Sequence, residues 1–283
     1  MTTQHELAVR FHSLHDPAAP LALANAWDAA SARIVAASGA AAIATSSAGV
    51  AWSLGAADGN RVERDEALAL LARITGAVAG LGLPVTADIE SGFGTGPQAV
   101  ADTVARVLAT GAVGVNIEDS DPEPDPDRPL RPVGAQAERL AAARGAADRA
   151  GIPLYLNARV DVFLRAKGEP SRRMDEALAR ARAYLEAGAS GVFVPGVADP
   201  ALIGELAAGI DAPLNILAGP ATPSVAELGA LGVARVSLGS AVAEAAYQVA
   251  VHAARELLET GTYQAVRDAV EFRRMNALMR GEA

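Results

Sequence analysis

Two acidic side chains, Asp88 and Glu90, stand two positions apart in the stretch "TADIESGFG" (86–94), where an apolar segment gives way to a glycine-containing turn. Because side chains alternate along a β-strand, residues two apart lie on the same face. A third carboxylate, Glu118, ends the next apolar segment. Carboxylates gathered at one place repel one another unless a proton or a cation neutralises them. The three residues are therefore predicted to hold a hard divalent cation through oxygen, Mg²⁺ by preference and with Mn²⁺ able to substitute.

Arg159 and Asn157 end a later apolar segment, and their types suit the binding of a planar anion. A guanidinium can donate two parallel hydrogen bonds to one carboxylate, so Arg159 is predicted to bind a carboxylate of the substrate. An internal ion pair with Glu118 or Asp161 is the alternative role for this arginine.

A loop of small residues follows another apolar segment. Ser46, Ser47 and Gly49 stand where backbone N–H groups after a strand could bind a second carboxylate. Small residues are common in any tight loop, so a purely structural turn is the alternative. Trp27 follows the first predicted strand and Trp52 follows this loop, and packing is a more usual role for tryptophan than contact with a substrate.

Several catalytic classes lack the residues that they need. The chain contains no cysteine, which excludes a thiolate metal site and a cysteine nucleophile. Its four histidines lie before the first predicted strand or in a late helix, which argues against a zinc site at the strand ends. The one lysine, Lys167, lies beyond the fifth predicted strand, which argues against a Schiff-base aldolase.

Eight short apolar segments alternate with segments whose apolar residues recur at three- and four-residue spacing. The predicted strands cover residues 21–25, 41–45, 84–88, 113–118, 153–158, 191–195, 213–217 and 235–239. This alternation predicts a parallel sheet covered by helices, and eight repeats in about 250 residues predict a (β/α)8 barrel. A doubly wound open sheet is the alternative, although no Gly-x-Gly-x-x-Gly motif follows the first strand. In a barrel, the three carboxylates, Asn157, Arg159 and the loop of small residues lie at the carboxyl ends of the strands, where such enzymes carry their active sites.

One domain is expected across residues 1–283, because no linker rich in serine and glycine divides the chain. The segment 119–132, "DSDPEPDPDRPLRP", is the one break in composition, and its prolines rule out a regular helix. It is predicted to be a long loop, either a surface excursion or a lid over the barrel mouth.

Two helices are predicted after the last strand, over residues 241–260 and 262–280, which is one more than a barrel needs. The second carries four apolar residues at helical spacing, Phe272, Met275, Leu278 and Met279. This spacing predicts an apolar face that is buried against another surface. The segment 241–283 is therefore expected to take part in oligomerisation.

Charge and hydropathy restrict the partners. A formal net charge of −9 argues against binding to nucleic acid or to an anionic membrane. The start of the chain, "MTTQHELAVRFHSLHDP", lacks the continuous apolar stretch of a secretory signal. No run of about 18 apolar residues suggests a membrane span. A cytoplasmic protein that acts on a small molecule is expected.

Several stretches together resemble the isocitrate lyase and phosphoenolpyruvate mutase superfamily. They are "TSSAGVAWSLGAADG" (45–59), "TADIESGFG" (86–94), "VGVNIEDS" (113–120) and "LNARVDVFL" (156–164), with "LAGPATPSVAELGALGVARVSLGS" (217–240) typical of its shorter bacterial members. The resemblance covers most of the chain in the right order. It implies a (β/α)8 barrel with Mg²⁺ at its mouth. It also implies a homotetramer, or a dimer, in which a C-terminal helix is exchanged between subunits.

The resemblance also implies roles for individual residues. Asp88 is similar to the direct metal ligand, with Glu90 and Glu118 acting mostly through bound water. Asp58 is similar to an acidic residue on a mobile loop, and it is expected to act in catalysis with Arg159 and Glu118. The expected substrate contacts are Trp27, Ser46, Ser47, Ala48, Asn157, Arg159 and Asn215.

Two motifs of the superfamily are missing. Isocitrate and methylisocitrate lyases carry a Lys-Lys-Cys-Gly-His motif, which a chain without cysteine cannot contain. Where phosphoenolpyruvate mutase has Glu-Asp-Lys-x-x-Pro-Lys, this chain reads "EDSDPEPDPD" (118–127). Without these two motifs, the resemblance still implies the step that the superfamily shares, in which bond cleavage in a metal-bound α-oxyacid yields an enolate.

The leading hypothesis is a Mg²⁺-dependent lyase or decarboxylase that cleaves a C–C bond of a small 2-oxo or 2-hydroxy dicarboxylate, such as an oxaloacetate-like or substituted malate-like acid. The alternative within the superfamily is cleavage of a P–C bond of the phosphonopyruvate type, by hydrolysis or mutation. A phosphosugar enzyme and a non-enzymatic binding barrel are further alternatives. The carboxylates and Arg159 argue against a non-enzymatic barrel, because the stability of a barrel does not require charged side chains at the strand ends.

Overall fold

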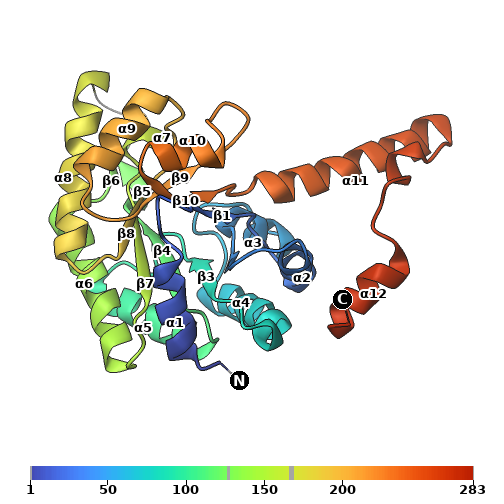
Figure 1. Cartoon of the computed structure of the whole chain (residues 1–283), viewed down its shortest axis with the longest axis horizontal. Helices are drawn as coiled ribbons and strands as arrows, with labels where there is room; N and C mark the ends of the chain where they lie inside the picture. Colours follow the sequence, from blue (N-terminus) through green and yellow to red (C-terminus); the bar gives the residue numbers. More distant parts are fainter. Residues whose placement is uncertain (1, 126–127, 166–168, 283) are drawn as a thin grey trace.

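The chain folds into a barrel from which a helical arm extends (Figure 1). The computed structural model describes residues 2–125, 128–165 and 169–282. Eight parallel strands form one sheet in the order β1-β10-β9-β8-β7-β4-β3-β2. The sheet closes where Ala26, just after β1, forms a parallel bridge with Thr45, just after β2. The predicted (β/α)8 barrel is therefore confirmed. Lys167, the lysine predicted to lie beyond the fifth strand, lies outside the described residues.

The strands occupy the predicted segments. They are β1 (Leu21–Leu23), β2 (Ile43–Ala44), β3 (Val85–Asp88), β4 (Gly114–Glu118), β7 (Tyr155–Arg159), β8 (Gly191–Val194), β9 (Leu214–Leu217) and β10 (Val233–Ser237). The prediction was wrong for the bounds of β10, which begins and ends two residues before the predicted 235–239. Gly232 and Gly239 adopt φ angles of 97° and 56°. These left-handed turns bracket the strand and shift it toward the amino terminus.

Helices surround the sheet or extend from it. They are α1 (Gln4–Ser13), α2 (Ala29–Ala37), α3 (Ser47–Ser53), α4 (Arg64–Val78), α5 (Pro97–Ala109), α6 (Val133–Arg149), α7 (Val162–Arg165), α8 (Arg173–Glu186), α9 (Pro200–Gly209), α10 (Val225–Ala230), α11 (Ala241–Thr260) and α12 (Phe272–Arg280), with short 3₁₀ turns η1 (Ala79–Leu81), η2 (Pro170–Arg172) and η3 (Gln264–Val266). Among the residues that the structure describes, none of these helices is long and apolar enough to cross a membrane.

Helix α1 closes the amino end of the barrel. Phe11 is fully buried and meets the Tyr155 ring edge-on, with ring centroids 5.4 Å apart. His15 stacks on the same tyrosine at 3.8 Å. These rings fill that end of the barrel interior, so a ligand would approach from the opposite end, where the strands terminate.

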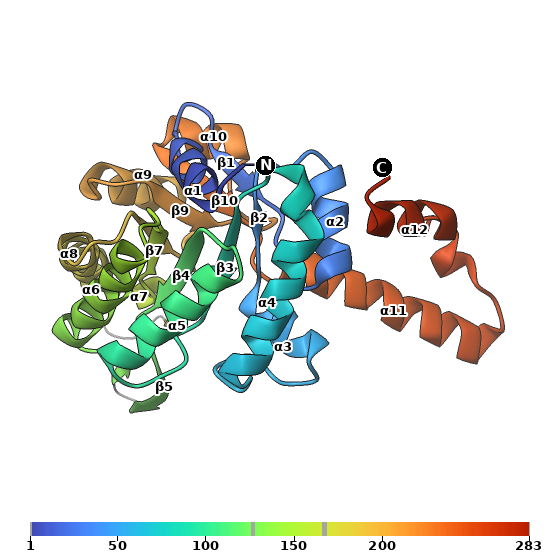
Figure 2. The same ribbon diagram turned by 90° about the horizontal axis from the view of Figure 1, so that it is seen from below.

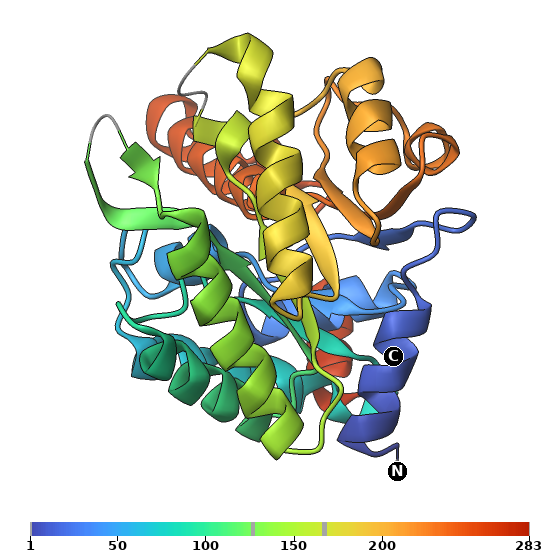
Figure 3. The same ribbon diagram turned by 90° about the vertical axis from the view of Figure 1, so that its left-hand side faces the viewer.

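The segment predicted as a long loop contains a β-hairpin instead, made of β5 (Ser120–Asp125) and β6 (Arg128–Leu130). The two strands pair antiparallel, with Ser120 opposite Leu130. Prolines lack a backbone donor but are tolerated in edge strands, so their presence excluded a helix without excluding a strand. The hairpin follows β4 at the carboxyl end of the barrel, where it projects from the rim (Figure 3).

The C-terminal arm consists of the described residues from 241 onward. Of the two helices predicted there, the first is confirmed and the second is corrected. Helix α11 matches the predicted 241–260, but the chain then turns, and α12 covers only the last part of 262–280. The Glu256 carboxylate stabilises the turn by accepting hydrogen bonds from the N–H groups of Gln264 and Ala265, at 2.8 and 2.7 Å. Helix α12 then returns toward α2, where Leu278 is buried (Figure 2).

Candidate active site

Strand register brings the predicted carboxylates and the arginine to the carboxyl end of the barrel. Asp88 on β3 pairs with Asn116 on β4, and Glu118, two residues farther along β4, pairs with Arg159 on β7. Glu90 follows β3, and its carbonyl accepts a hydrogen bond from the Glu118 N–H at 2.9 Å. Three neighbouring strands therefore place these side chains around one site.

Asp88 is oriented through both of its carboxylate oxygens. Ser47 Oγ donates to Oδ2 at 3.1 Å, and the Glu90 N–H donates to Oδ1 at 3.2 Å. Burial raises the pKa of this carboxyl above its usual range, although the charge of Arg159 opposes the rise. Asp88 is thus held in place in an environment that disfavours its negative charge, and a bound cation would offset that cost.

Glu90 has an unusual backbone conformation. Its φ of 51° lies in the left-handed region, as does the φ of Phe93 at 52°, a region that residues other than glycine rarely adopt. Strain of this kind persists where the surrounding structure imposes it, and it clusters at functional sites. The carboxylate accepts a hydrogen bond from the Asn60 N–H, and burial raises its pKa to about 7.

Arg159 lies between two buried carboxylates. Its Nη1 is 2.8 Å from Glu118 Oε2, while Nε and Nη2 donate to Asp161 Oδ1 and Oδ2 at 2.6 and 3.1 Å. Burial lowers the pKa of Arg159, but the charges of Glu118 and Asp161 outweigh this effect and raise it overall. Burial raises the pKa of Glu118 to about 8, against the pull of Arg159. Both alternative ion pairs of Arg159 are therefore present, and its binding of a substrate carboxylate stays a prediction.

The site gathers more carboxyl groups than one guanidinium can neutralise. Asp88, Glu90, Glu118 and Asp161 all interact electrostatically with the guanidinium of Arg159. A divalent cation would neutralise the excess, and oxygen donors are the set that Mg²⁺ prefers. Across residues 2–125, 128–165 and 169–282, no three acidic or histidine side chains converge into a ready-made metal cage. The residues therefore fit a hydrated cation with Asp88 as its direct ligand, and that assignment stays a prediction.

Asn157 and Asn215, which were predicted to contact the substrate, lie in a buried amide layer inside the barrel. Asn157 Nδ2 donates to Asn116 Oδ1 at 2.9 Å and to Asn215 Oδ1 at 3.2 Å. Arg235 Nη2 reaches the same Asn116 oxygen at 3.3 Å. Asn157 Oδ1 is buried without a hydrogen-bond partner, as are Arg235 Nε and Nη1, so a ligand could still contact this layer through the Asn157 oxygen.

The predicted carboxylate-binding loop begins helix α3. Ser46 caps the helix, its hydroxyl accepting from the Gly49 N–H at 3.4 Å. Ser47 turns toward the site and bonds Asp88, and Ala48 is buried. Ser47 is therefore the serine of this loop whose side chain reaches the carboxylates.

Trp27 packs beside the same loop. A Cβ on Gly49 would lie 2.8 Å from Trp27 Cβ, so glycine permits a contact that a larger residue would prevent. The Trp27 ring centroid is 6.5 Å from that of Tyr247 on α11, and Trp52 lies 6.1 Å from the same tyrosine. This arrangement shows how Trp27 packs and does not test a contact with substrate.

Asp58 lies on the loop between α3 and α4 and is exposed. Its charge is close enough to help raise the pKa of Asp88 and of Glu90, in each case after burial as the larger cause. Asn60 fixes the loop nearby, since its backbone donates to Glu90 and its Oδ1 accepts from Ser91 Oγ at 2.7 Å. The structure therefore places Asp58 at the rim of the site.

Sequence reasoning assigned no role to Asn60, Ser120 or Arg235, all of which contact residues of this site. The Arg-x-Asp spacing of "NARVD" (157–161) signalled the pair of Arg159 and Asp161, but nothing local signals Ser120 Oγ, which donates to Asp161 Oδ2 at 2.5 Å. That contact joins residues 41 positions apart, and it depends on the fold.

Comparison with known proteins gives a family and several relatives. The family model described as phosphoenolpyruvate phosphomutase matches residues 11–258. The 2-methylisocitrate lyase of Escherichia coli (strain K12) is 30% identical over 260 residues, covering 90% of this chain and 85% of that protein. The oxaloacetate decarboxylase of Ectopseudomonas mendocina (strain ymp) is 32% identical over 210 residues, covering 72% of this chain and 67% of that protein.

Solved structures share the fold. A protein from Burkholderia cenocepacia J2315 is 46% identical with a TM-score of 0.83, covering 88% of this chain and 99% of that one. A phosphonopyruvate hydrolase in complex with oxalate and Mg²⁺ has a TM-score of 0.83 at 23% identity, covering 99% of this chain and 95% of that one. At that identity the second likeness concerns the fold alone.

Proposed function

The chain belongs to the phosphoenolpyruvate phosphomutase family, and on that premise we propose that it is a Mg²⁺-dependent lyase or decarboxylase that cleaves a C–C bond of a small 2-oxo or 2-hydroxy dicarboxylate through an enolate. The observation that carries this proposal is the group of buried carboxylates around Arg159. Two relatives are named for methylisocitrate, a 2-hydroxy tricarboxylate, and for oxaloacetate, a 2-oxo dicarboxylate.

The proposed chemistry needs stabilisation of one developing charge. When the C–C bond breaks, its electron pair passes into an enolate of one product fragment, and negative charge grows on oxygen. A divalent cation supplies Lewis-acid stabilisation of such charge when bound. Asp88 would hold that cation directly, with Glu90 and Glu118 around its water shell. Arg159 would bind a carboxylate of the substrate in surroundings where burial strengthens the attraction.

The two substrate types differ in their need for a base. Loss of the carboxylate at carbon 4 of a 2-oxo dicarboxylate releases CO₂, leaves the bond's electron pair in the enolate and requires no proton acceptor for the cleavage step. Cleavage of a 2-hydroxy acid turns the hydroxyl into a carbonyl, and a base must accept its proton. Asp58, at the rim of the site, is the proposed acceptor. Activity that depends on Asp58 would therefore favour 2-hydroxy substrates.

The proposal is tested by incubating the purified protein with oxaloacetate and with malates substituted at carbon 2 or 3, each with Mg²⁺ or with EDTA. We expect a carbonyl product from at least one acid in Mg²⁺ and none in EDTA. Phosphate release from phosphonopyruvate, measured alongside, would favour P–C cleavage instead. No turnover of any of these acids with Mg²⁺ or Mn²⁺ would overturn the proposal.

We also propose that the protein assembles as a helix-exchanged homo-oligomer, a tetramer or a dimer. Helix α11 projects from the barrel (Figure 1), and Ala243 is its buried residue. The arm exposes a series of large apolar side chains, namely Tyr247, Val249, Val251, Leu257, Leu258, Tyr263, Val266, Val270, Phe272 and Met279. An apolar surface of this kind is typical of a protein interface.

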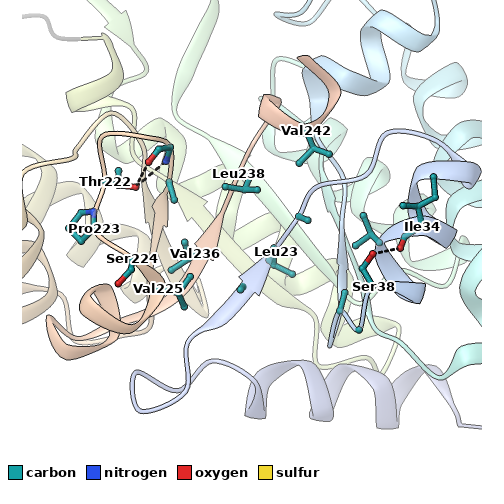
Figure 4. Close-up of a pocket in the computed structure, with 17 residues that line it drawn as sticks. Leu23, Ile34, Ser38, Thr222, Pro223, Ser224, Val225, Val236, Leu238 and Val242 are labelled. Atoms are coloured by element: carbon teal, nitrogen blue, oxygen red, sulfur yellow. Dashed lines mark hydrogen bonds between the residues drawn. The ribbon is translucent and has the colours of Figure 1, made fainter. Parts of the chain in front are cut away.

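A groove on the barrel supplies the complementary surface. It has a volume of about 650 Å³ and lies between α2, α10 and the adjoining strands β1 and β10 (Figure 4). Apolar side chains line it, among them Leu23, Ile34, Val225, Val236 and Leu238. In a barrel the eighth helix packs beside the eighth strand, and here α11 leads away from that position. The proposed occupant is the C-terminal arm of a second copy of this chain.

A further inference from the structure

Asp161 accepts two hydrogen bonds along one edge of the Arg159 guanidinium. Oδ1 accepts from Nε at 2.6 Å, and Oδ2 accepts from Nη2 at 3.1 Å. A guanidinium has five N–H donors in one fixed plane, so this contact takes up the Nε–H and one N–H of Nη2. Three N–H donors remain, two on Nη1 and the second on Nη2, and Glu118 Oε2 lies 2.8 Å from Nη1. Arg159 can therefore offer a ligand only the end formed by Nη1 and Nη2.

Asp161 is itself fixed by its surroundings. It is 0% exposed, and its backbone N–H donates to Asp119 Oδ1 at 2.9 Å. Ser120, the first residue of β5, donates its hydroxyl to Asp161 Oδ2 at 2.5 Å. Asp119 is in turn held by Arg180 and Tyr184, at 3.0 and 2.9 Å. The orientation of Asp161 is thus set independently of Arg159, and the arginine must follow it.

The flat face of the guanidinium has a second support. Arg159 Cζ lies 5.9 Å from the ring centroid of Phe193, on β8, within the range of a cation–π contact. Asp161 therefore fixes the edge of the guanidinium and Phe193 supports its face. Together the two contacts leave little freedom for the end that points toward Glu118.

We infer that Asp161 and Ser120 are positioning residues for Arg159, and that they fix the guanidinium end on which a substrate carboxylate binds and so restrict which oxyacids fit the site. This inference rests on the proposed function. A stabilising role explains the pair less well, because the cost of desolvating a buried ion pair offsets much of its attraction. A fixed bidentate contact beside a ligand site instead lowers the entropy that binding must overcome.

The test is the affinity for oxalate in the presence of Mg²⁺, measured by titration calorimetry. Asp161→Asn should weaken oxalate binding about tenfold, the size of effect typical for a hydrogen bond to a charged group. Ser120→Ala should weaken it about threefold, since it removes one neutral donor from Asp161. Affinity for Mg²⁺ alone should change less than about twofold in both. Asp65→Asn, which breaks the exposed ion pair with Arg106, is the matched control and should leave oxalate binding unchanged.

A comparison of single and double variants distinguishes a positioning role of Asp161 from a general loss of structure. In an Arg159→Lys background, Asp161→Asn should weaken oxalate binding less than about twofold further, because the group that Asp161 positions is already gone. An additive loss of about tenfold in that background would overturn the inference. Should Asp161→Asn fail to fold, as judged by thermal unfolding, the same comparison is made with Ser120→Ala.

A second readout does not depend on the proposed function. The Arg159 Nε–H signal in ¹H–¹⁵N spectra, assigned by its loss in Arg159→Lys, should exchange with water at least about tenfold faster in Asp161→Asn than in the wild type. Unchanged exchange would overturn the positioning role. Faster exchange, combined with no oxalate binding by wild-type protein, would support positioning of the arginine and count against the proposed function instead.

Discussion

Glu118 Oε2 and Arg159 Nη1 lie 2.8 Å apart at the end of neighbouring strands, so the carboxylate occupies the end of the guanidinium that Asp161 leaves open. A substrate carboxylate that binds Arg159 must compete with Glu118 for that end. A divalent cation near Asp88 would attract Glu118 in the opposite direction. The affinity for oxyacid and the affinity for metal are therefore expected to be coupled through this one contact.

Glu118→Gln is expected to separate the two affinities. Above about pH 8, where the Glu118 carboxyl is ionised, the uncharged amide removes the internal competitor of Arg159, and oxalate should bind about tenfold more tightly in EDTA than it binds the wild type. Affinity for Mg²⁺ should fall in the same variant, because one carboxylate is lost from the site. Titration calorimetry measures both quantities. Glu90→Gln is the control, since Glu90 bonds Asn60 and should weaken Mg²⁺ binding without improving metal-free oxalate binding. Unchanged or weaker oxalate binding by Glu118→Gln in EDTA would contradict the competition.

Asp88→Ala is expected to abolish activity and leave the fold intact, because it removes the proposed direct ligand and leaves the apolar core unchanged. Mg²⁺ that binds the folded state should raise the melting temperature of the wild type, and this rise should disappear in Asp88→Ala. EDTA should silence the wild-type enzyme, and Mg²⁺ or Mn²⁺ should restore it. Thermal unfolding with and without metal tests the assignment before a substrate is known. Full activity in chelator would exclude the metal role.

Stability is expected to fall as the pH rises from about 6.5 to about 8 and to level off above that, because Glu90 and Glu118 have pKa values of about 7 and about 8 in the folded protein, against an ordinary 4.5. A carboxyl whose pKa is raised by folding stabilises the folded state below its unfolded pKa, and that stabilisation is lost as the pH rises through the folded value. The depressed pKa values of His12 and His15 act in the opposite direction, mainly below their ordinary 6.5, so the window begins there.

Melting temperatures in EDTA across that window give the measurement. Glu118→Gln should flatten the decline, because its side chain no longer titrates. Added Mg²⁺ should stabilise the wild type more at the upper end of the window, where the carboxyls are ionised. A decline of equal steepness in wild type and Glu118→Gln would show that another group is responsible.

The barrel could be predicted from the sequence because its signals are local. Each strand is a short apolar run, and the helix that follows it carries apolar residues at helical spacing, so strand β3 and helix α5 can be recognised without knowing their neighbours. Proline content misled the prediction at β5 and β6, since it excludes helix and leaves edge strands open. The shortened α12 depends on a side chain, Glu256, that holds the turn from an earlier helix.

The site was only partly predictable for a related reason. Asp88 and Arg159 end strands and Glu90 follows one, and the barrel rule alone brings strand ends together. The contact of Ser120 with Asp161, and that of Asn60 with Glu90, join loops whose conformations no local pattern specifies. The choice among partners for Arg159 could not be made from residue types, because Glu118 and Asp161 are equally suitable acceptors and the structure uses both.

Deleting residues 262–283 is expected to disrupt the oligomer, because the deletion removes α12 and the exposed Phe272 from the proposed exchanged arm. Light scattering should then give a lower mass than that of the full chain. Leu258→Glu, on the exposed part of α11, should have the same effect without shortening the chain. The control is Leu81→Glu, which places the same charge at an exposed leucine of η1, outside the arm. An unchanged mass in both arm variants would remove the proposed exchange.

Asp58→Asn is expected to lower kcat about a hundredfold on a 2-hydroxy substrate and to leave Mg²⁺ affinity nearly unchanged, unlike Asp88→Ala. Asp58 is exposed at the rim, yet Asn60, two residues on, is bonded to Glu90 within the site. A small movement of the loop about that anchor would bring the Asp58 carboxylate to a substrate hydroxyl, and closure of this kind also excludes water from an enolate. The alternative is a surface turn, since Asp-Gly pairs commonly form turns. Steady-state kinetics and metal titration on the same preparation discriminate between them. Wild-type kcat in Asp58→Asn, on a substrate that the wild type demonstrably cleaves, would assign the residue to the turn.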